Sequence, residues 1–103
     1  MNSARNKRQF QRTHGSVPIE LRHRGVPLRS TASALSCGGC HVALASALPV
    51  GTAVDVVLWT GNVKLAFRGT IRNADGMGNG VEFTGITEEQ RTRLQRYLQE
   101  VNR

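Results

Sequence analysis

Two arginines near the start of the chain, Arg8 and Arg12, have the spacing and chemistry of an anion-binding clamp. They form an Arg-x-x-x-Arg pattern, and Lys7 stands directly before it. Guanidinium groups pair with phosphates through two parallel hydrogen bonds and stack on bases, which ammonium groups cannot do. In an arginine-rich chain, however, this short pattern alone is typical of a solvated basic arm. Its meaning therefore depends on the rest of the sequence.

Residues 37–41 carry a second recognisable pattern, Cys-x-x-Cys-His. In c-type cytochromes this pattern attaches haem through two thioethers and an iron-binding histidine. We expect no haem here, because no export signal precedes the pattern and it lies between predicted strands rather than on a helix. No zinc site is predicted, since His14, His23 and His41 form no second ligand pair. Two small, half-buried cysteines in a turn are the favoured interpretation, with a thiol switch as the alternative.

The acidic side chains do not indicate an active site. None of the seven Asp and Glu residues forms a spaced pair with His or Ser of the kind used for acid–base or nucleophilic catalysis. Glu88 and Glu89 are better explained by the positive end of a helix dipole. We therefore predict a binding domain and not an enzyme.

Length and charge narrow the class of protein. A chain of 103 residues is long enough for one hydrophobic core and one domain. The formal net charge is +7, and all basic residues except Lys7 and Lys64 are arginines; this favours a phosphate-bearing partner, although a solvating surface has the same composition. No segment approaches the roughly 20 apolar residues of a membrane span, and the polar start lacks a secretory h-region. We expect a cytoplasmic protein without membrane insertion.

The chain divides into a short basic arm and a β-rich domain. Residues 1–15 contain several cations but one large apolar side chain, Phe10, so we expect an arm that is flexible without a ligand. Residues 16–103 are expected to form one domain. Alternation of apolar and polar residues over 17–21 predicts its first strand, and a second extended stretch runs from 26 towards 34.

The clearest hairpin signal lies in the middle of the chain. Apolar side chains alternate over residues 54–58 and 63–71, on either side of the turn sequence Thr-Gly-Asn at 60–62, which predicts two paired strands. Gly69 interrupts the second row and predicts a β-bulge. Residues 73–79 predict a glycine-rich turn.

The predicted domain ends with a strand at 80–83 and one helix. Thr87 and Gln90 fit a capping box at the start of the helix. Helical spacing is kept by a row of apolar residues that should cover one opening of the sheet or barrel: Ile86, Leu94, Tyr97, Leu98 and Val101. The elements together predict an all-β fold with one C-terminal helix, a six- to seven-stranded antiparallel β-barrel, with a two-sheet sandwich as the alternative.

Three short motifs occur in a fixed order along this scaffold. The RxxxR pattern of residues 8–12 precedes the first strand, Ala-Leu-Ser-Cys-Gly-Gly at 34–39 follows the second, and Gly-Val-Glu-Phe at 80–83 is the last strand before the helix. This order resembles the PilZ family, whose members combine an RxxxR arm, a DxSxxG motif headed by Asp or Asn, a late Gly-Val-x-Phe strand and a C-terminal helix. The resemblance spans residues 7–98.

The resemblance implies a ligand, the bacterial second messenger cyclic di-GMP. By resemblance, Arg8 and Arg12, with Lys7 beside them, would bind phosphate and the O6/N7 edge of guanine. Ser36 would offer a hydroxyl group, and Gly39 would let the ligand approach the backbone. The arm would become ordered over the ligand, and a downstream protein partner would respond to that ordering.

One residue departs from the family pattern. Ala34 stands where the family usually has Asp or Asn, so an acceptor for guanine is missing. A hydrogen bond to a charged group contributes ~1.5–3 kcal/mol, so its loss weakens binding about 10- to 150-fold. Ser33 or Ser36 could compensate for it.

Two other functions fit the same residues. The departure at Ala34 keeps open a degenerate PilZ-like domain that binds protein and no nucleotide. A basic barrel could also be an OB-like nucleic-acid binder. Such modules stack bases on surface aromatics, whereas Phe67, Phe83 and Tyr97 fit core positions, so nucleic acid is the less favoured partner.

Overall fold

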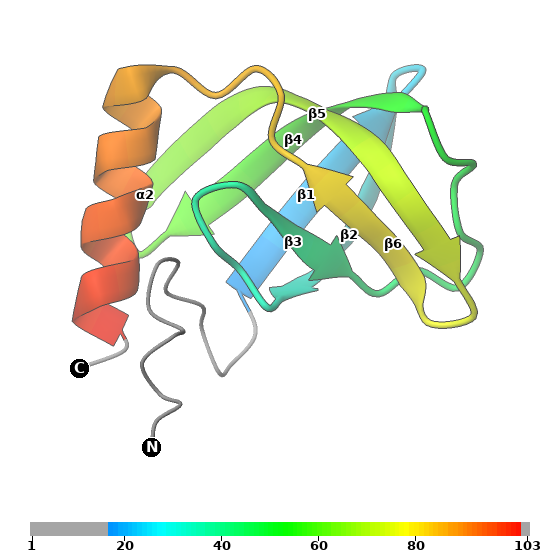
Figure 1. The fold of residues 1–103 in the computed structure, drawn as a ribbon, viewed down its shortest axis with the longest axis horizontal. Coiled ribbons are helices and arrows are strands. Elements are labelled where there is room, and N and C mark those ends of the chain that lie inside the picture. Colours follow the sequence, from blue (N-terminus) through cyan, green and yellow to red (C-terminus); the bar gives the residue numbers. More distant parts are fainter. Residues whose placement is uncertain (1–16, 102–103) are drawn as a thin grey trace.

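The computed structural model describes residues 17–101, and the predicted arm with Lys7, Arg8 and Arg12 lies outside them. Six antiparallel strands form a closed barrel in the order β1-β2-β3-β6-β5-β4. A single helix follows the last strand (Figure 1). The predicted all-β barrel with a C-terminal helix is confirmed. Its elements are β1 (Val17–His23), β2 (Val26–Ser33), β3 (Gly39–Val42), β4 (Ala53–Thr60), β5 (Val63–Asp75), β6 (Gly78–Glu82) and α2 (Glu88–Val101).

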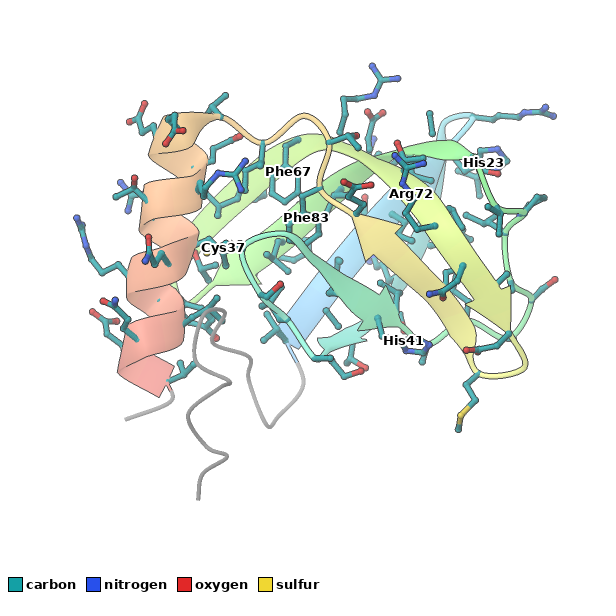
Figure 2. The ribbon with its side chains drawn as sticks, viewed as in Figure 1. His23, Cys37, His41, Phe67, Arg72 and Phe83 are labelled. Atoms are coloured by element: carbon teal, nitrogen blue, oxygen red, sulfur yellow. The ribbon has the colours of Figure 1, made fainter. Side chains whose placement is uncertain are left out.

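The core lies inside the barrel and follows the alternation in the sequence. Alternate residues of β1, β4 and the first half of β5 are buried there, because successive side chains of a strand point to opposite faces. The inward rows include Ile19 and Leu21, Val54, Val56 and Leu58, and Leu65, Phe67 and Ile71. Phe67 and Phe83 meet edge to face with ring centroids 4.8 Å apart, near the end of the barrel that α2 covers (Figure 2).

Helix α2 closes one end of the barrel (Figure 1). The predicted capping box is confirmed: the Thr87 N–H donates to Gln90 Oε1 at 2.9 Å, and the Gln90 N–H donates to Thr87 Oγ1 at 3.1 Å. The Gln90 side-chain amide also donates to the Ala66 carbonyl at 2.7 Å, which ties the start of the helix to β5. Leu94 and Leu98 are buried against the barrel. Within the described part of the chain, no helix is both long and apolar enough to cross a membrane.

Four local predictions are wrong. Val101 of the predicted apolar row is exposed, and Cys40 is buried in β3 rather than half-buried in a turn.

Two of the wrong predictions concern β5. Gly69 is paired regularly with Val54, and the bulge lies instead at Arg72, between Ile71 and Asn73. A glycine suits position 69 for a different reason, because a Cβ there would lie 3.0 Å from Val56 Cγ2. The turn predicted over 73–79 is also shorter, because β5 continues to Asp75 and β6 begins at Gly78.

Candidate functional site

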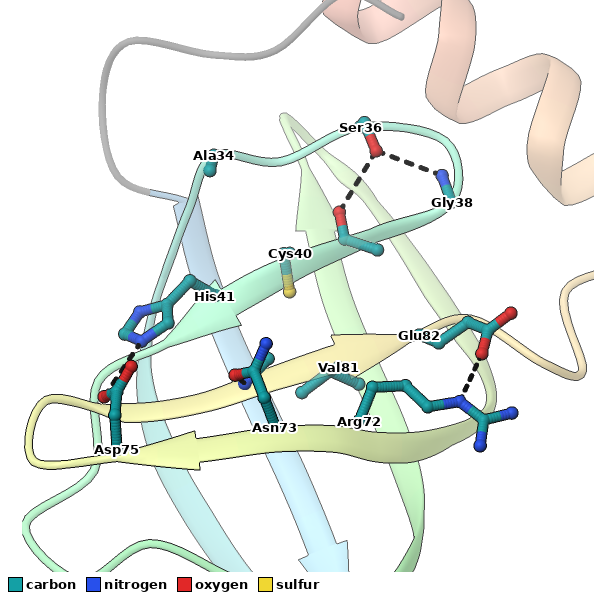
Figure 3. A pocket seen from close by; sticks show the side chains of 12 residues that line it. Ala34, Ser36, Gly38, Cys40, His41, Arg72, Asn73, Asp75, Val81 and Glu82 are labelled. Atoms are coloured by element: carbon teal, nitrogen blue, oxygen red, sulfur yellow. Dashed lines mark hydrogen bonds and ion pairs between the residues drawn. The ribbon is translucent and has the colours of Figure 1, made fainter. Parts of the chain in front are cut away.

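A pocket of about 430 Å³ opens on the outer face of the barrel, where β3, β6 and the second half of β5 lie side by side (Figure 3). The sequence motif at 34–39 forms one rim. Three of the predicted ligand residues, Ala34, Ser36 and Gly39, therefore share one pocket. The other lining residues are Gly38, Cys40, His41, Arg72, Asn73, Asp75, Gly80, Val81 and Glu82.

Ser36 holds the turn between β2 and β3. Its N–H donates to the Gly39 carbonyl at 2.9 Å, and its hydroxyl oxygen accepts the Gly38 N–H at 3.2 Å. The same hydroxyl group donates to the Gly39 carbonyl at 3.4 Å. Ser36 is buried, so its first role is to shape the rim of the pocket, and a ligand contact would be added to that role.

Gly39 is required by the contact between two strands. It lies opposite Glu82 in the β3–β6 pair, and a Cβ at position 39 would lie within 2.3 Å of the Val81 carbonyl oxygen. The Phe83 N–H continues the pairing by donating to the Gly38 carbonyl at 2.9 Å. The glycine of the motif thus brings β3 and β6 together beneath the pocket, whether or not a ligand is bound.

Ala34 lies at the rim in a left-handed backbone conformation, with φ of 50°. For an L-residue with a Cβ this conformation costs roughly 1–2 kcal/mol, and Asn and Asp adopt it more readily than Ala. The backbone therefore offers a physical reason, besides ligand binding, for the Asp or Asn that the PilZ motif has at this position.

The bulge in β5 adds to the pocket two side chains that lie outside the predicted ligand residues, Arg72 and Asn73. Arg72 has no partner between the pairs Ile71–Val81 and Asn73–Gly80, so Arg72 and Asn73 both reach the outer face and line the pocket. The signal in the sequence was two successive polar residues, Arg72 and Asn73, directly after an apolar alternation. The turn predicted over 73–79 begins at Asn73 and does not include Arg72.

Hydrogen bonds and ion pairs hold the far wall of the pocket. Asn73 Oδ1 accepts the Gly80 N–H at 2.9 Å. Arg72 forms an ion pair with Glu82 (Figure 3). His41 Nε2 lies 3.9 Å from Asp75 Oδ1. The pocket therefore offers an arginine donor and carboxylate acceptors.

The cysteines of the Cys-x-x-Cys-His pattern face away from this histidine. Cys40 is buried, and burial raises the pKa of its thiol to about 12. The Cys37 side chain points toward α2, where its Sγ lies 4.0 Å from the Arg91 carbonyl (Figure 2). Because Cys40 and His41 are neighbours on a strand, they point to opposite faces, which does not suit haem attachment. Within residues 17–101, no group of three or more His, Cys, Asp or Glu could hold a metal.

Comparison with known folds gives the same barrel. MotI/DgrA of Bacillus subtilis, an inhibitor of motility, aligns with TM-score 0.76 and 17% identity over 93% of this chain and 52% of that chain. The chain thus spans about half of MotI. The PilZ domain of CeSA from a cellulose-synthesizing bacterium aligns with TM-score 0.70 and 18% identity, over 89% of this chain and 98% of that chain. The Escherichia coli YcgR PilZ domain, whose structure contains c-di-GMP, aligns with TM-score 0.70 and 17% identity, over 93% of this chain and 92% of that chain.

At these identities, the structural neighbours show a shared fold. A comparison with curated proteins finds no match. The sequence itself carries the assignment, because the family model of the PilZ domain matches residues 6–100. That match covers the RxxxR pattern, the 34–39 motif and nearly all of α2. This chain therefore belongs to the PilZ domain family.

Proposed function

We propose that this chain is a receptor domain for cyclic di-GMP and that the pocket beside Ala34 is its binding site. The observation that carries the proposal is the position of this pocket relative to the start of β1. Val17, the first residue of β1, is paired with Ala32, two residues before Ala34. The arm thus joins the barrel one strand away from the rim of the pocket.

The length of the arm is sufficient for its cations to reach the pocket. Arg12 precedes Val17 by five residues and Arg8 by nine. An extended chain spans at most 3.3–3.6 Å per residue, so these residues reach up to about 17 Å and about 30 Å from Val17. Arg8, Arg12 and Lys7 can therefore meet a ligand that also contacts the 34–39 rim.

The residues of the pocket fit the chemistry of this ligand. Cyclic di-GMP presents two phosphates and two guanines, and guanidinium groups pair with both phosphate oxygens and the guanine O6/N7 edge. Arg72 adds an arginine from the barrel to the two of the arm. The Gly38–Gly39 backbone has no side chain that would keep the ligand away from the rim.

The proposed receptor acts by binding and not by catalysis. When the arm closes on the nucleotide, the surface near β1 changes, and a downstream protein responds to that change. A cytoplasmic location, where the messenger would be available, is part of the proposal. The structure of YcgR with c-di-GMP supports the choice of ligand, since its PilZ domain has the same fold.

Calorimetry with cyclic di-GMP tests the proposal, with GTP and single-stranded DNA as competing ligands. Replacing both Arg8 and Arg12 with Ala should abolish binding and leave the thermal midpoint of the free protein unchanged. The matched control replaces Arg93 and Arg96, which are exposed on α2, and removes the same charge. Unaltered affinity in the Arg8/Arg12 variant, or equal loss in the control, contradicts the proposed role of the arm. A folded wild type that does not bind cyclic di-GMP favours a protein-interaction domain.

A further inference from the structure

A second hollow lies on the opposite side of the barrel. In the closed strand order β1-β2-β3-β6-β5-β4, the β1–β4 pair is diametrically opposite the β3–β6 pair that forms the nucleotide pocket. A groove of about 520 Å³ crosses the outer face there, between β1, β2, β4 and β5. Its charged residues are Glu20, Arg22, Arg29 and Lys64, and its apolar ones are Pro18, Val57 and Trp59.

Glu20 arranges two arginines at the centre of this groove. Arg22 Nε donates to Glu20 Oε2 at 2.7 Å, and Arg29 Nε donates to Glu20 Oε1 at 3.0 Å. The hydrogen bond from Arg22 is the main reason that the pKa of Glu20 lies below its ordinary value, and that from Arg29 is the next. Glu20 therefore stays ionised at neutral pH and keeps one donor on each of its oxygens.

The exposure of this triad is unusual among the ion pairs of the described chain. The Glu20 side chain is 5% exposed, whereas those of Arg22 and Arg29 are 53% and 81% exposed. In the pairs Arg68–Asp55 and Arg72–Glu82, by contrast, one arginine faces one exposed carboxylate. Within residues 17–101, Glu20 accepts only from the two Nε atoms, so no hydrogen bond there occupies the outer nitrogens of the two guanidinium groups, which can face a ligand.

The neighbouring side chains extend this cationic surface and give it an apolar floor. Trp59 and Lys64 are cross-strand partners on β4 and β5. Among residues 17–101, no carboxylate lies within 4.0 Å of the Lys64 ammonium group. Three cations and one acidic group thus line the groove, beside the half-buried side chains of Trp59 and Val57. Asp55, which lies opposite Arg22 on β4, is paired with Arg68 outside the groove.

We propose that this groove is a docking surface for an acidic segment of a partner protein. Carboxylates of the segment pair with Arg22, Arg29 and Lys64, and an aliphatic or aromatic side chain between them packs on Trp59. Tryptophan and arginine are the residues that most often dominate binding energy in protein interfaces. Charge complementarity with a cationic groove requires a negatively charged partner segment and speeds its association.

Other occupants fit this groove less well. Residues 1–16 include several cations and no Asp or Glu, so the chain's own arm is repelled. A second copy carries the same net charge of +7 and is repelled overall. Single-stranded nucleic acids are held by successive aromatic platforms, whereas Trp59 is the single aromatic residue among residues 17–101 that lines this groove.

The test uses the full chain and its single tryptophan, Trp59, as a built-in reporter. The probe is a synthetic peptide of alternating glutamate and phenylalanine or leucine, and its control has glutamine in place of glutamate. We expect a saturable change in Trp59 fluorescence with the acidic peptide alone. Arg29→Gln and Lys64→Gln should each weaken binding by about fivefold or more, which corresponds to about 1 kcal/mol. Both variants should keep the wild-type affinity for cyclic di-GMP, so this test does not depend on the proposed receptor function.

Two further variants separate a shaped site from general attraction. Arg93→Gln on α2 removes the same charge outside the groove and should leave peptide affinity unchanged. Glu20→Gln raises the net positive charge but releases the two arginines, so it should weaken binding if Glu20 positions them. If the Glu20→Gln variant has a native amide NMR spectrum and binds the acidic peptide more tightly than the wild type, the proposal is overturned. The proposal is also overturned if the acidic peptide gives no saturable signal, or if Arg93→Gln weakens binding as much as the groove variants. Stronger binding of single-stranded DNA at this groove, or dimer formation through it, overturns it as well.

Discussion

A β-carbon placed on Gly39 would lie within 2.3 Å of the Val81 carbonyl oxygen, across the contact between β3 and β6. The neighbouring Gly38 has no such contact, since its nearest atom would be Ser36 Oγ at 4.0 Å. The two adjacent glycines of the motif therefore have different roles. Gly39 is required for strand pairing, and Gly38 is not.

This difference predicts the outcome of two matched substitutions. Gly39→Ala should destabilise the protein by about 1–3 kcal/mol or more, because the clash is with backbone that cannot move without breaking β-pairing. Gly38→Ala should change the free energy of unfolding by less than about 0.5 kcal/mol. Urea denaturation of both variants measures the difference. Equal stability of the two proteins would show that β3 and β6 can separate without cost.

Ala34 predicts a stabilising substitution at the rim of the pocket. Its left-handed conformation, with φ of 50°, is strained for Ala and free for Gly. Ala34→Gly should therefore raise the free energy of unfolding by about 0.5–1 kcal/mol, after the entropy that glycine adds to the unfolded chain. Thermal and chemical denaturation test this prediction. A Gly variant less stable than the wild type would show that the backbone at Ala34 is not strained.

The same position predicts a change in ligand affinity. Ala34→Asp adds an acceptor beside the pocket and should tighten cyclic di-GMP binding by roughly 10-fold or more, given ~1.5–3 kcal/mol for such a hydrogen bond. Ala34→Gly is the control, because it relieves the same backbone strain without an acceptor. Calorimetry of both variants separates the two effects. An unchanged dissociation constant for a folded Asp variant would assign the acceptor role to another pocket group, such as Asp75.

Arg72 and Glu82 predict opposite effects on the same binding reaction. Arg72→Ala removes a cation from the pocket and should weaken cyclic di-GMP binding. Glu82→Gln frees Arg72 from its ion pair, and exposed pairs contribute ~0.2–1 kcal/mol, so affinity should rise by up to about fivefold. Arg68→Ala is the matched control, since Arg68 is also paired and exposed on β5 but lies outside the pocket. If Arg68→Ala and Arg72→Ala have equal effects, only net charge matters.

The two thiols predict slow and unequal reactivity. Burial raises the pKa of Cys40 to about 12 and also raises the pKa of Cys37, where the nearby charge of Arg91 acts against it. Since the thiolate is the reactive form, at pH 8 Cys37 should be alkylated slowly and Cys40 more slowly still, and both should react quickly in denaturant. Mass spectrometry after timed iodoacetamide treatment measures both rates. Ready formation of a Cys37–Cys40 disulfide in the folded protein would instead support the thiol switch.

Several features of this protein follow from local sequence, and for a common physical reason. The inward rows of β1, β4 and β5 follow from alternation, because a strand places every second side chain on one face. The helix start follows from Thr87 and Gln90, whose hydrogen bonds join residues three apart. The candidate ligand residues of the 34–39 motif were also identified along the chain, and the structure brings Ala34, Ser36 and Gly39 together in one pocket.

Other features depend on which strands become neighbours. The bulge at Arg72, and the outward position of both Arg72 and Asn73, result from the register between β5 and β6. A glycine is required at position 39 because the carbonyl group of Val81, 42 positions later in the chain, leaves no room for a Cβ. The Glu20 triad needs β1 and β2 paired so that Arg29 faces Glu20, and its groove needs β4 and β5 as well. Period-two alternation tells which face a side chain occupies, but the order and register of the strands in the closed barrel decide which side chains lie beside it on that face.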